Sequence, residues 1–68
     1  LEITKQILKQ APDYLTPNGV LVCEVGNSMV SLIEQYPDVP FEWVKLKNGG
    51  LGVFAISRED LVKYHDSF

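Results

Sequence analysis

Residues 20–29 read VLVCEVGNSM, and this stretch marks the point where a strand gives way to a helix. Its first six residues are apolar except for Glu24, a pattern typical of a strand in a parallel sheet that helices cover on both faces. Gly26 ends the strand, and the side-chain oxygen of Asn27 or Ser28 can cap the helix that follows. We therefore predict a strand, a sharp turn and a helix, which together form the first half of a βαβ crossover.

The predicted helix after this turn has one apolar face and is ended by Pro37. The residues on that face are Met29, Leu32, Ile33 and Tyr36.

The segment before the strand begins with a predicted amphipathic helix over residues 1–11. Pro12 suits the first position of a new turn, and we expect that turn to place Tyr14 and Leu15 on the core. The sequence TPNG at 16–19 then favours a turn before the strand. The apolar stripe of the helix consists of Ile3, Ile7, Leu8 and Ala11.

Two further segments are rich in β-forming residues, at 41–47 and 52–57. We predict that they form two neighbouring antiparallel strands. The sequence NGGLG at 48–52 favours a hairpin loop between them. Ser57 and Asp60 resemble a capping box at the start of a last short helix, which runs through Leu61, Val62 and Tyr64. The sequence therefore predicts an α/β fold, with a three-stranded mixed sheet and flanking helices.

The composition is that of one small folded unit of 68 residues, with 46% hydrophobic residues and a net charge of −3. The acidic balance argues against nucleic-acid binding, because counterion release requires clustered Lys and Arg. The single cysteine excludes an internal disulfide and fits a reducing compartment. We expect no membrane span, because no run of eighteen apolar residues is present. The start at Leu1 leads us to expect a piece of a longer protein.

Three blocks carry a resemblance to a known family: CEVGNSM at 23–29, YPDVPF at 36–41 and NGGLGVF at 48–54. In this order and spacing they closely resemble the carboxyl-terminal part of the bacterial ribosomal-protein glutamine methyltransferases, relatives of the release-factor glutamine methyltransferases. The resemblance covers nearly the whole chain. It implies that residues 1–68 are the carboxyl-terminal segment of a class I, Rossmann-like methyltransferase domain, in which the last strand inserts antiparallel between its two predecessors.

The resemblance also implies a function and shows which parts of its machinery are missing here. The family methylates the side-chain amide of one glutamine in a large-subunit ribosomal protein, in the cytoplasm, with S-adenosylmethionine as cofactor. Its glycine-rich cofactor loop, its acidic ribose-binding residue and its Asn-Pro-Pro-Tyr motif are all absent from this sequence. We therefore expect no catalytic, cofactor-binding or metal-binding residue in the chain, and no activity from the chain alone.

A substrate-side loop of the longer enzyme is the one functional site we expect, formed by Glu24, Gly26 and Asn27. These residues follow the carboxyl end of the predicted strand, the edge at which open α/β sheets bind ligands. For Glu24 a structural role is favoured over this functional one. In that case the Glu24 carboxylate accepts hydrogen bonds from loop amides or pairs with a basic residue elsewhere in the longer protein.

The other chemically reactive residues favour structural interpretations. Cys23 lies in an apolar run with no nearby histidine, which favours a small core residue over a nucleophile. His65 lies near the chain end, where we expect nothing to order the tail. We therefore predict that His65 is a surface residue. The sequence GGLG at 49–52 joins two strands, so a hairpin is favoured over a phosphate cradle. Lys45 and Lys47 predict a solvated strand face rather than a contact with ribosomal RNA.

Two alternatives to the methyltransferase stay open from the residues themselves. One is a small non-catalytic α/β interaction module, and the other is a fragment of an adenine-specific DNA methyltransferase. The expected topology has a further consequence: strand 20–25 keeps one edge unpaired in the isolated chain. An apolar strand with free N–H and C=O groups pairs readily with another chain, so we expect self-association through strand 20–25.

Overall fold

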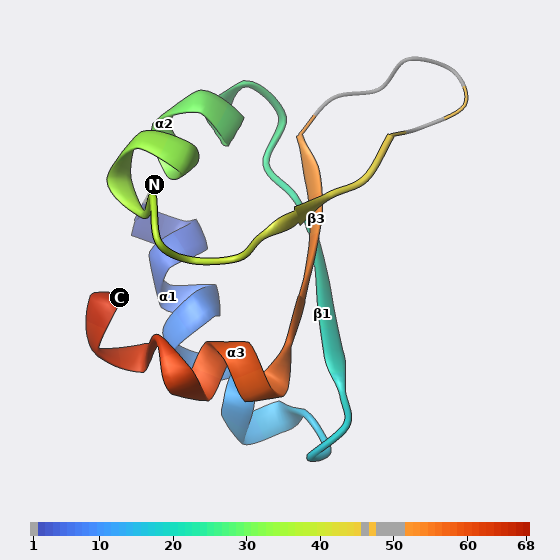
Figure 1. Ribbon diagram of the computed structural model, residues 1–68, viewed down its shortest axis with the longest axis vertical. Coiled ribbons are helices and arrows are strands. Elements are labelled where there is room, and N and C mark those ends of the chain that lie inside the picture. The colour runs from blue at the N-terminus through green and yellow to red at the C-terminus, as the bar shows by residue number, and fades with distance from the viewer. Residues whose placement is uncertain (1, 46, 48–51) are drawn as a thin grey trace.

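The computed structural model describes residues 2–45, 47 and 52–68, and it has a three-stranded sheet packed against helices (Figure 1). The described elements are α1 (Glu2–Gln10), the 3₁₀ turn η1 (Ala11–Tyr14), β1 (Val20–Glu24), the 3₁₀ turn η2 (Gly26–Ser28), α2 (Met29–Gln35), β2 (Glu42–Trp43), β3 (Val53–Ser57), α3 (Arg58–Lys63) and the 3₁₀ turn η3 (His65–Ser67). The predicted α/β fold with flanking helices is therefore confirmed.

The last strand, β3, lies in the middle of the sheet, whose strand order is β1-β3-β2. It pairs antiparallel with both neighbours, so Phe54 lies opposite Cys23 on one side and opposite Trp43 on the other. The predicted insertion of the last strand between its two predecessors is confirmed. The expectation of a mixed sheet is wrong for the described chain, because β3 separates the two strands that run in the same direction.

The strand predicted over 41–47 is much shorter than expected, since β2 contains only Glu42 and Trp43. One further hydrogen bond, from the Val44 N–H to the carbonyl oxygen of Val53, continues the pairing. β propensity measures how well a residue fits a half-buried pleated surface, and Val44 and Lys45 are exposed at the sheet edge. The predicted hairpin loop lies outside the described residues, apart from Gly52.

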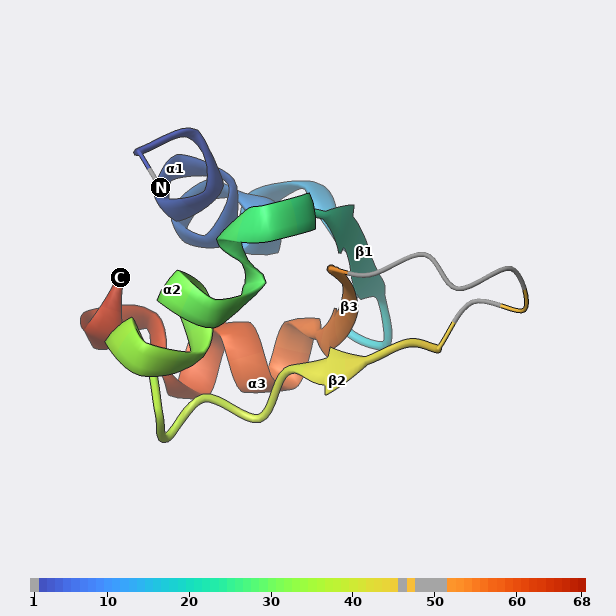
Figure 2. The same cartoon turned by 90° about the horizontal axis from the view of Figure 1, so that it is seen from above.

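The core lies between one face of the sheet and the helices, all three of which pack on the same side (Figure 2). β3 contributes Phe54 and Ile56, and the edge-on packing of Phe41 and Trp43 against Phe54 brings the ring centroids to 4.8 and 5.5 Å. The other buried hydrophobic residues are Leu8, Ala11, Leu32, Tyr36, Val39, Leu61 and Phe68. The core is therefore built mostly by helices on β3.

No helix in the described part of the chain covers the second face of β1, contrary to the expectation of helices on both faces. Val20 is 53% exposed and Val22 is 65% exposed, whereas Leu21 and Cys23 pack against the core. The alternation arises because residues two apart on a strand share a face, and the helices lie on only one side of the sheet.

The apolar stripes of the helices are also only partly buried. In α1 the contact runs through Leu8, while Ile3 is 77% exposed. Tyr14 was expected in the core, but it is 84% exposed, while Leu15 does pack against the core. On the predicted apolar face of α2, Ile33 is likewise exposed. Each stripe is wider than the surface that the neighbouring elements cover, so sequence periodicity overestimates the buried set.

Hydrogen bonds join the start of α3 to the segment before β1. The Arg58 Nε donates to the carbonyl oxygen of Pro12 at 3.0 Å, and the Arg58 backbone N–H donates to that of Gly19 at 2.9 Å. The predicted turn before β1 is confirmed by a bond from the Gly19 N–H to the Thr16 carbonyl oxygen. Ser57 caps α3 as predicted, because its Oγ accepts the Asp60 N–H at 3.1 Å.

The carboxyl-terminal residue is ordered, contrary to the expectation for the tail. Phe68 is only 6% exposed and packs edge-on against Tyr36, with the ring centroids 5.2 Å apart. An aromatic side chain can anchor a chain end in this way because it buries a large apolar surface.

Candidate functional site

The turn at the end of β1 is built from two glycines that lie against each other. Gly26 has a φ of 54°, a left-handed conformation that fits the predicted sharp turn, and Gly52 has a φ of 82°. The Val25 N–H donates to the carbonyl oxygen of Gly52 at 2.6 Å. A Cβ atom on Gly52 would lie 2.6 Å from the Gly26 nitrogen and 2.7 Å from its Cα. The backbones therefore approach too closely for any side chain on Gly52.

The helix after this turn begins without a side-chain cap, contrary to the sequence prediction. Neither Asn27 nor Ser28 caps α2 with its side chain; η2 leads into the helix instead, and the Ser28 N–H donates to the Val25 carbonyl oxygen at 3.0 Å. Because Gly26 is left-handed, the chain turns so that backbone N–H and C=O groups form hydrogen bonds with one another. The amide of Asn27 is exposed as a result.

Glu24 is the last residue of β1, and its side chain shares the uncovered face of the sheet with Val20 and Val22. Within the part of the chain that the structure describes, its carboxylate has no hydrogen-bond or ion-pair partner. The structure thus places Glu24 and Asn27 on either side of the Gly26 turn, both exposed. A carboxylate and an amide provide hydrogen-bond acceptors and a donor for a polar ligand, but no nucleophile and no paired base.

Cys23 lies on the opposite face of β1 and packs against the core, as predicted. Burial raises the pKa of its thiol, because a thiolate is less well solvated there than in water. His65 is exposed in η3, again as predicted, and Lys45 and Lys47 are exposed. Among the described residues, no group of three His, Cys, Asp or Glu side chains could hold a metal ion.

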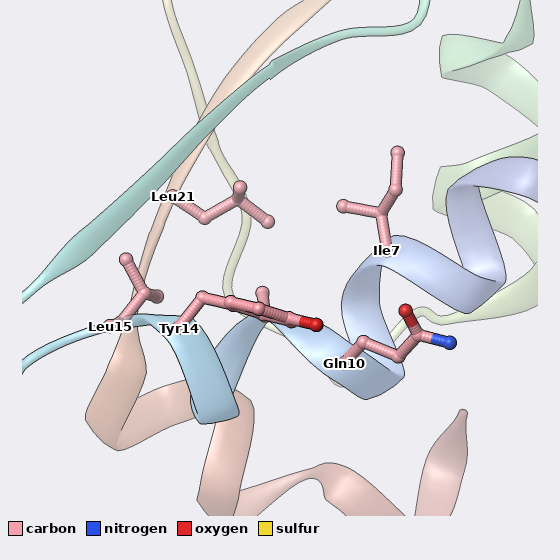
Figure 3. Close-up of a pocket in the computed structure, with 6 residues that line it drawn as sticks. Ile7, Gln10, Tyr14, Leu15 and Leu21 are labelled. Atoms are coloured by element: carbon pink, nitrogen blue, oxygen red, sulfur yellow. The ribbon is translucent and has the colours of Figure 1, made fainter.

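An apolar groove of about 290 Å³ lies between β1 and the segment formed by α1 and η1 (Figure 3). Leu21 extends from β1 toward η1, and Ile7 rises from α1 on the other side of the groove. The lining residues are Ile7, Gln10, Ala11, Tyr14, Leu15 and Leu21. The sequence did not predict this groove, although apolar residues at helical spacing, from Ile7 to Tyr14, were the available signal.

A second hollow of about 160 Å³ lies at the other end of the sheet, where β2 and the start of α3 meet. Glu42, Ser57 and Asp60 are its polar residues. Of these, the Ser57 Oγ already accepts the hydrogen bond from the Asp60 N–H that caps α3. No helix within the described ranges has the length and apolar character needed to cross a membrane.

The chain is similar over its whole length to curated proteins of one name. It is 47% identical over 68 residues to a ribosomal protein uL3 glutamine methyltransferase from Francisella tularensis subsp. tularensis, a match that covers 100% of this chain and 22% of that protein. It is 42% identical over 66 residues to a protein of the same name from Xylella fastidiosa, which corresponds to 97% of this chain and 21% of that protein. The resemblance carried by the three sequence blocks is confirmed.

The chain spans about a fifth of the length of these curated relatives. No family model matches the chain, and no solved structure matches it.

Proposed function

We propose that this sequence is the carboxyl-terminal segment of an S-adenosylmethionine-dependent methyltransferase that modifies a glutamine side-chain amide of a ribosomal protein. The observation that carries the proposal is the 47% identity to the Francisella tularensis protein over all 68 residues. The substrate named for that relative is ribosomal protein uL3, and we assign the same substrate class here. A cytoplasmic location follows from a ribosomal substrate.

The residues of this chain do not fit the cofactor itself. The turn between β1 and α2 has a single glycine and a 3₁₀ turn, and the exposed side chains beside it are Glu24 and Asn27. The sequence has neither a second strand–loop–helix unit with a ribose-binding acid nor an Asn-Pro-Pro-Tyr motif. We therefore assign binding and chemistry to the remainder of the longer protein, and the described residues to its scaffold.

The scaffold role is a Rossmann-like sheet edge. A last strand inserted antiparallel between its two predecessors is what the family resemblance implies, and β3 occupies this position. Support for this assignment also comes from the uncovered face of β1, since Val20 and Val22 leave apolar surface for another layer of protein.

The turn after β1 is the part of this chain that we place nearest the substrate. Glu24 and Asn27 are exposed at the carboxyl end of β1, and the left-handed Gly26 holds them apart in a fixed turn. An amide nitrogen is a poor nucleophile, so its methylation depends on orientation. We assign Glu24 and Asn27 as positioning residues that hydrogen-bond the protein substrate around the reacting glutamine.

Neither alternative is favoured by a specific observation. A DNA methyltransferase fragment would gain nothing from a net charge of −3. A freestanding interaction module would not explain identity over the whole chain to two methyltransferases.

The test is a chimera of the Francisella tularensis relative in which this chain replaces the matched segment. The unmodified chimera should methylate ribosomal protein uL3. In that background, Glu24→Gln combined with Asn27→Ala should raise KM for the protein substrate about tenfold and leave KM for S-adenosylmethionine unchanged. Glu34→Gln, an exposed change on α2, is the matched control and should alter neither constant. A double variant that changes only the cofactor KM would contradict the substrate-side role.

A further inference from the structure

Gly52 is buried and lies against the turn that carries Glu24 and Asn27. In the β1–β3 register Glu24 lies opposite Val53, and Val25 continues this register opposite Gly52. The Val25 N–H donates to the Gly52 carbonyl oxygen at 2.6 Å. Gly52 is therefore the point at which the segment before β3 holds the end of β1.

Two carbonyl groups carry this contact onward into the start of α2. The Val25 carbonyl oxygen accepts the Ser28 N–H at 3.0 Å, and the Gly26 carbonyl oxygen accepts the Met29 N–H. The atom that a Cβ on Gly52 would approach most closely is this same Gly26 carbonyl oxygen. The backbone of Gly52 therefore sets where η2 begins.

The lack of a side chain on Gly52 fixes the position of the turn closely. A Cβ there would lie 2.6 Å from the Gly26 nitrogen, whereas ordinary van der Waals contact begins at 3.4 Å. Moving the nitrogen from 2.6 to 3.4 Å would displace the turn by about 0.8 Å, and a misplacement on the order of 1 Å can slow a reaction that depends on orientation about a hundredfold. Even one added methyl group would therefore matter for groups that the turn has to orient.

We propose that Gly52 is a positioning residue for methyl transfer to the protein substrate. It has no side chain with which to contact that substrate, so it acts through the Gly26 turn, which sets the separation of Glu24 and Asn27. The inference rests on the proposed function, because it acts only through the two residues assigned there to the substrate side. The contact joins two described segments to each other, so it needs no surface that the remainder of the longer protein would cover.

The test uses the chimera of the Francisella tularensis relative, because the chimera is a complete enzyme. Gly52→Ala should raise KM for ribosomal protein uL3 about tenfold and leave KM for S-adenosylmethionine within about twofold of the parent chimera. A loss of stability alone would reduce the amount of active enzyme, and hence the apparent kcat, without changing KM. An unchanged KM for uL3 in a folded Gly52→Ala chimera would overturn the proposal.

Ser57→Ala is the matched control, because it removes the cap of α3 at the other end of β3. It lowers stability and leaves the Gly52 contact in place, so both KM values should equal those of the parent chimera. A Ser57→Ala chimera with the same rise in KM for uL3 would mean that general destabilisation causes the effect. That result would also overturn the proposal.

A double-mutant cycle tests whether Gly52 acts through Glu24 and Asn27. In a chimera that already carries Glu24→Gln and Asn27→Ala, Gly52→Ala should raise KM for uL3 by less than about twofold further. The reason is that the polar groups which the turn orients are no longer present. A further tenfold rise would mean that Gly52 acts independently of them, and would overturn the proposal.

Amide exchange of the unsubstituted chimera requires no variant, so it decides the question if Gly52→Ala does not fold. The Val25 amide donates to Gly52 and should be equally protected with and without bound uL3, because the contact sets the turn before the substrate arrives. Protection that develops only when uL3 is added would mean that the substrate sets the turn. That result, or fast exchange in both states, would overturn the proposal.

Failure of this proposal is distinguishable from failure of the proposed function. If Glu24→Gln with Asn27→Ala raises KM for uL3 and Gly52→Ala does not, Gly52 has no positioning role and the proposed function stands. A folded chimera that transfers no methyl group would contradict both.

Discussion

Gly52→Ala tests whether the contact between the two glycines holds the turn after β1. A residue other than glycine with φ near 82° costs about 1–2 kcal/mol. The new Cβ would lie 2.6 Å from the Gly26 nitrogen, so the two backbones must separate. Separation weakens the hydrogen bond from Val25 to Gly52, which is worth about 1 kcal/mol. Alanine recovers about 0.4–1 kcal/mol by restricting the unfolded chain, which leaves a net loss of about 2 kcal/mol.

Gly26→Ala is the matched comparison, because Gly26 has the same kind of backbone but open space around its Cβ position. Only the conformational cost applies there, so we expect a loss of about 1 kcal/mol. A chain of this size has a total stability on the order of 3–10 kcal/mol, so both losses are measurable.

Urea unfolding followed by Trp43 fluorescence measures both variants, since this single tryptophan packs against Phe41 and Phe54. With a slope of about 1 kcal/mol per molar, the Gly52→Ala midpoint should fall by about 2 M and the Gly26→Ala midpoint by about 1 M. Equal midpoints for the two variants would refute the close-contact argument. An unchanged midpoint for Gly26→Ala would refute the argument that a left-handed backbone at this position costs free energy for alanine.

Three further outcomes follow from the same structure. Calorimetric titration of the isolated chain with S-adenosylmethionine should show no binding; saturable binding at micromolar cofactor would contradict the assignment of the cofactor site to the remainder of the protein. Ser57→Ala should lower the unfolding free energy by about 1 kcal/mol through loss of the α3 cap, and Ser57→Asp should largely restore it. Because burial raises the pKa of Cys23, less thiolate is present at any given pH, and alkylation of the folded chain should be slower than that of the urea-unfolded chain at pH 8. Equal rates would count against burial of the thiol.

Local backbone chemistry was predictable from the sequence. The sharp turn at Gly26 followed from a glycine between an apolar strand and a helix, and the Ser57 cap followed from its spacing to Asp60. The central position of β3 came instead from the family resemblance, because hairpin signals alone do not fix which neighbour a strand takes.

Burial was less predictable, because it depends on which elements cover a face rather than on residue type. Val22 and Tyr14 belong to apolar patterns and are nevertheless exposed, since no helix in the described chain lies over them. The prediction of a side-chain cap on α2 was wrong for a related reason. The Gly26 turn supplies backbone partners that replace the side chain of Asn27. The Gly52 contact could not be anticipated, because it joins two segments distant in sequence.

Methyl transfer by the chimera of the Francisella tularensis relative is the measurement that tests the central claim most directly. The chain shares 47% of its residues with the matched segment, so the apolar contacts of that segment should be largely kept. We predict that the chimera methylates ribosomal protein uL3 at a glutamine side chain with kcat/KM within about tenfold of the parent enzyme. A chimera that folds and binds S-adenosylmethionine normally, yet transfers no methyl group, would contradict the assignment of this sequence to a glutamine methyltransferase.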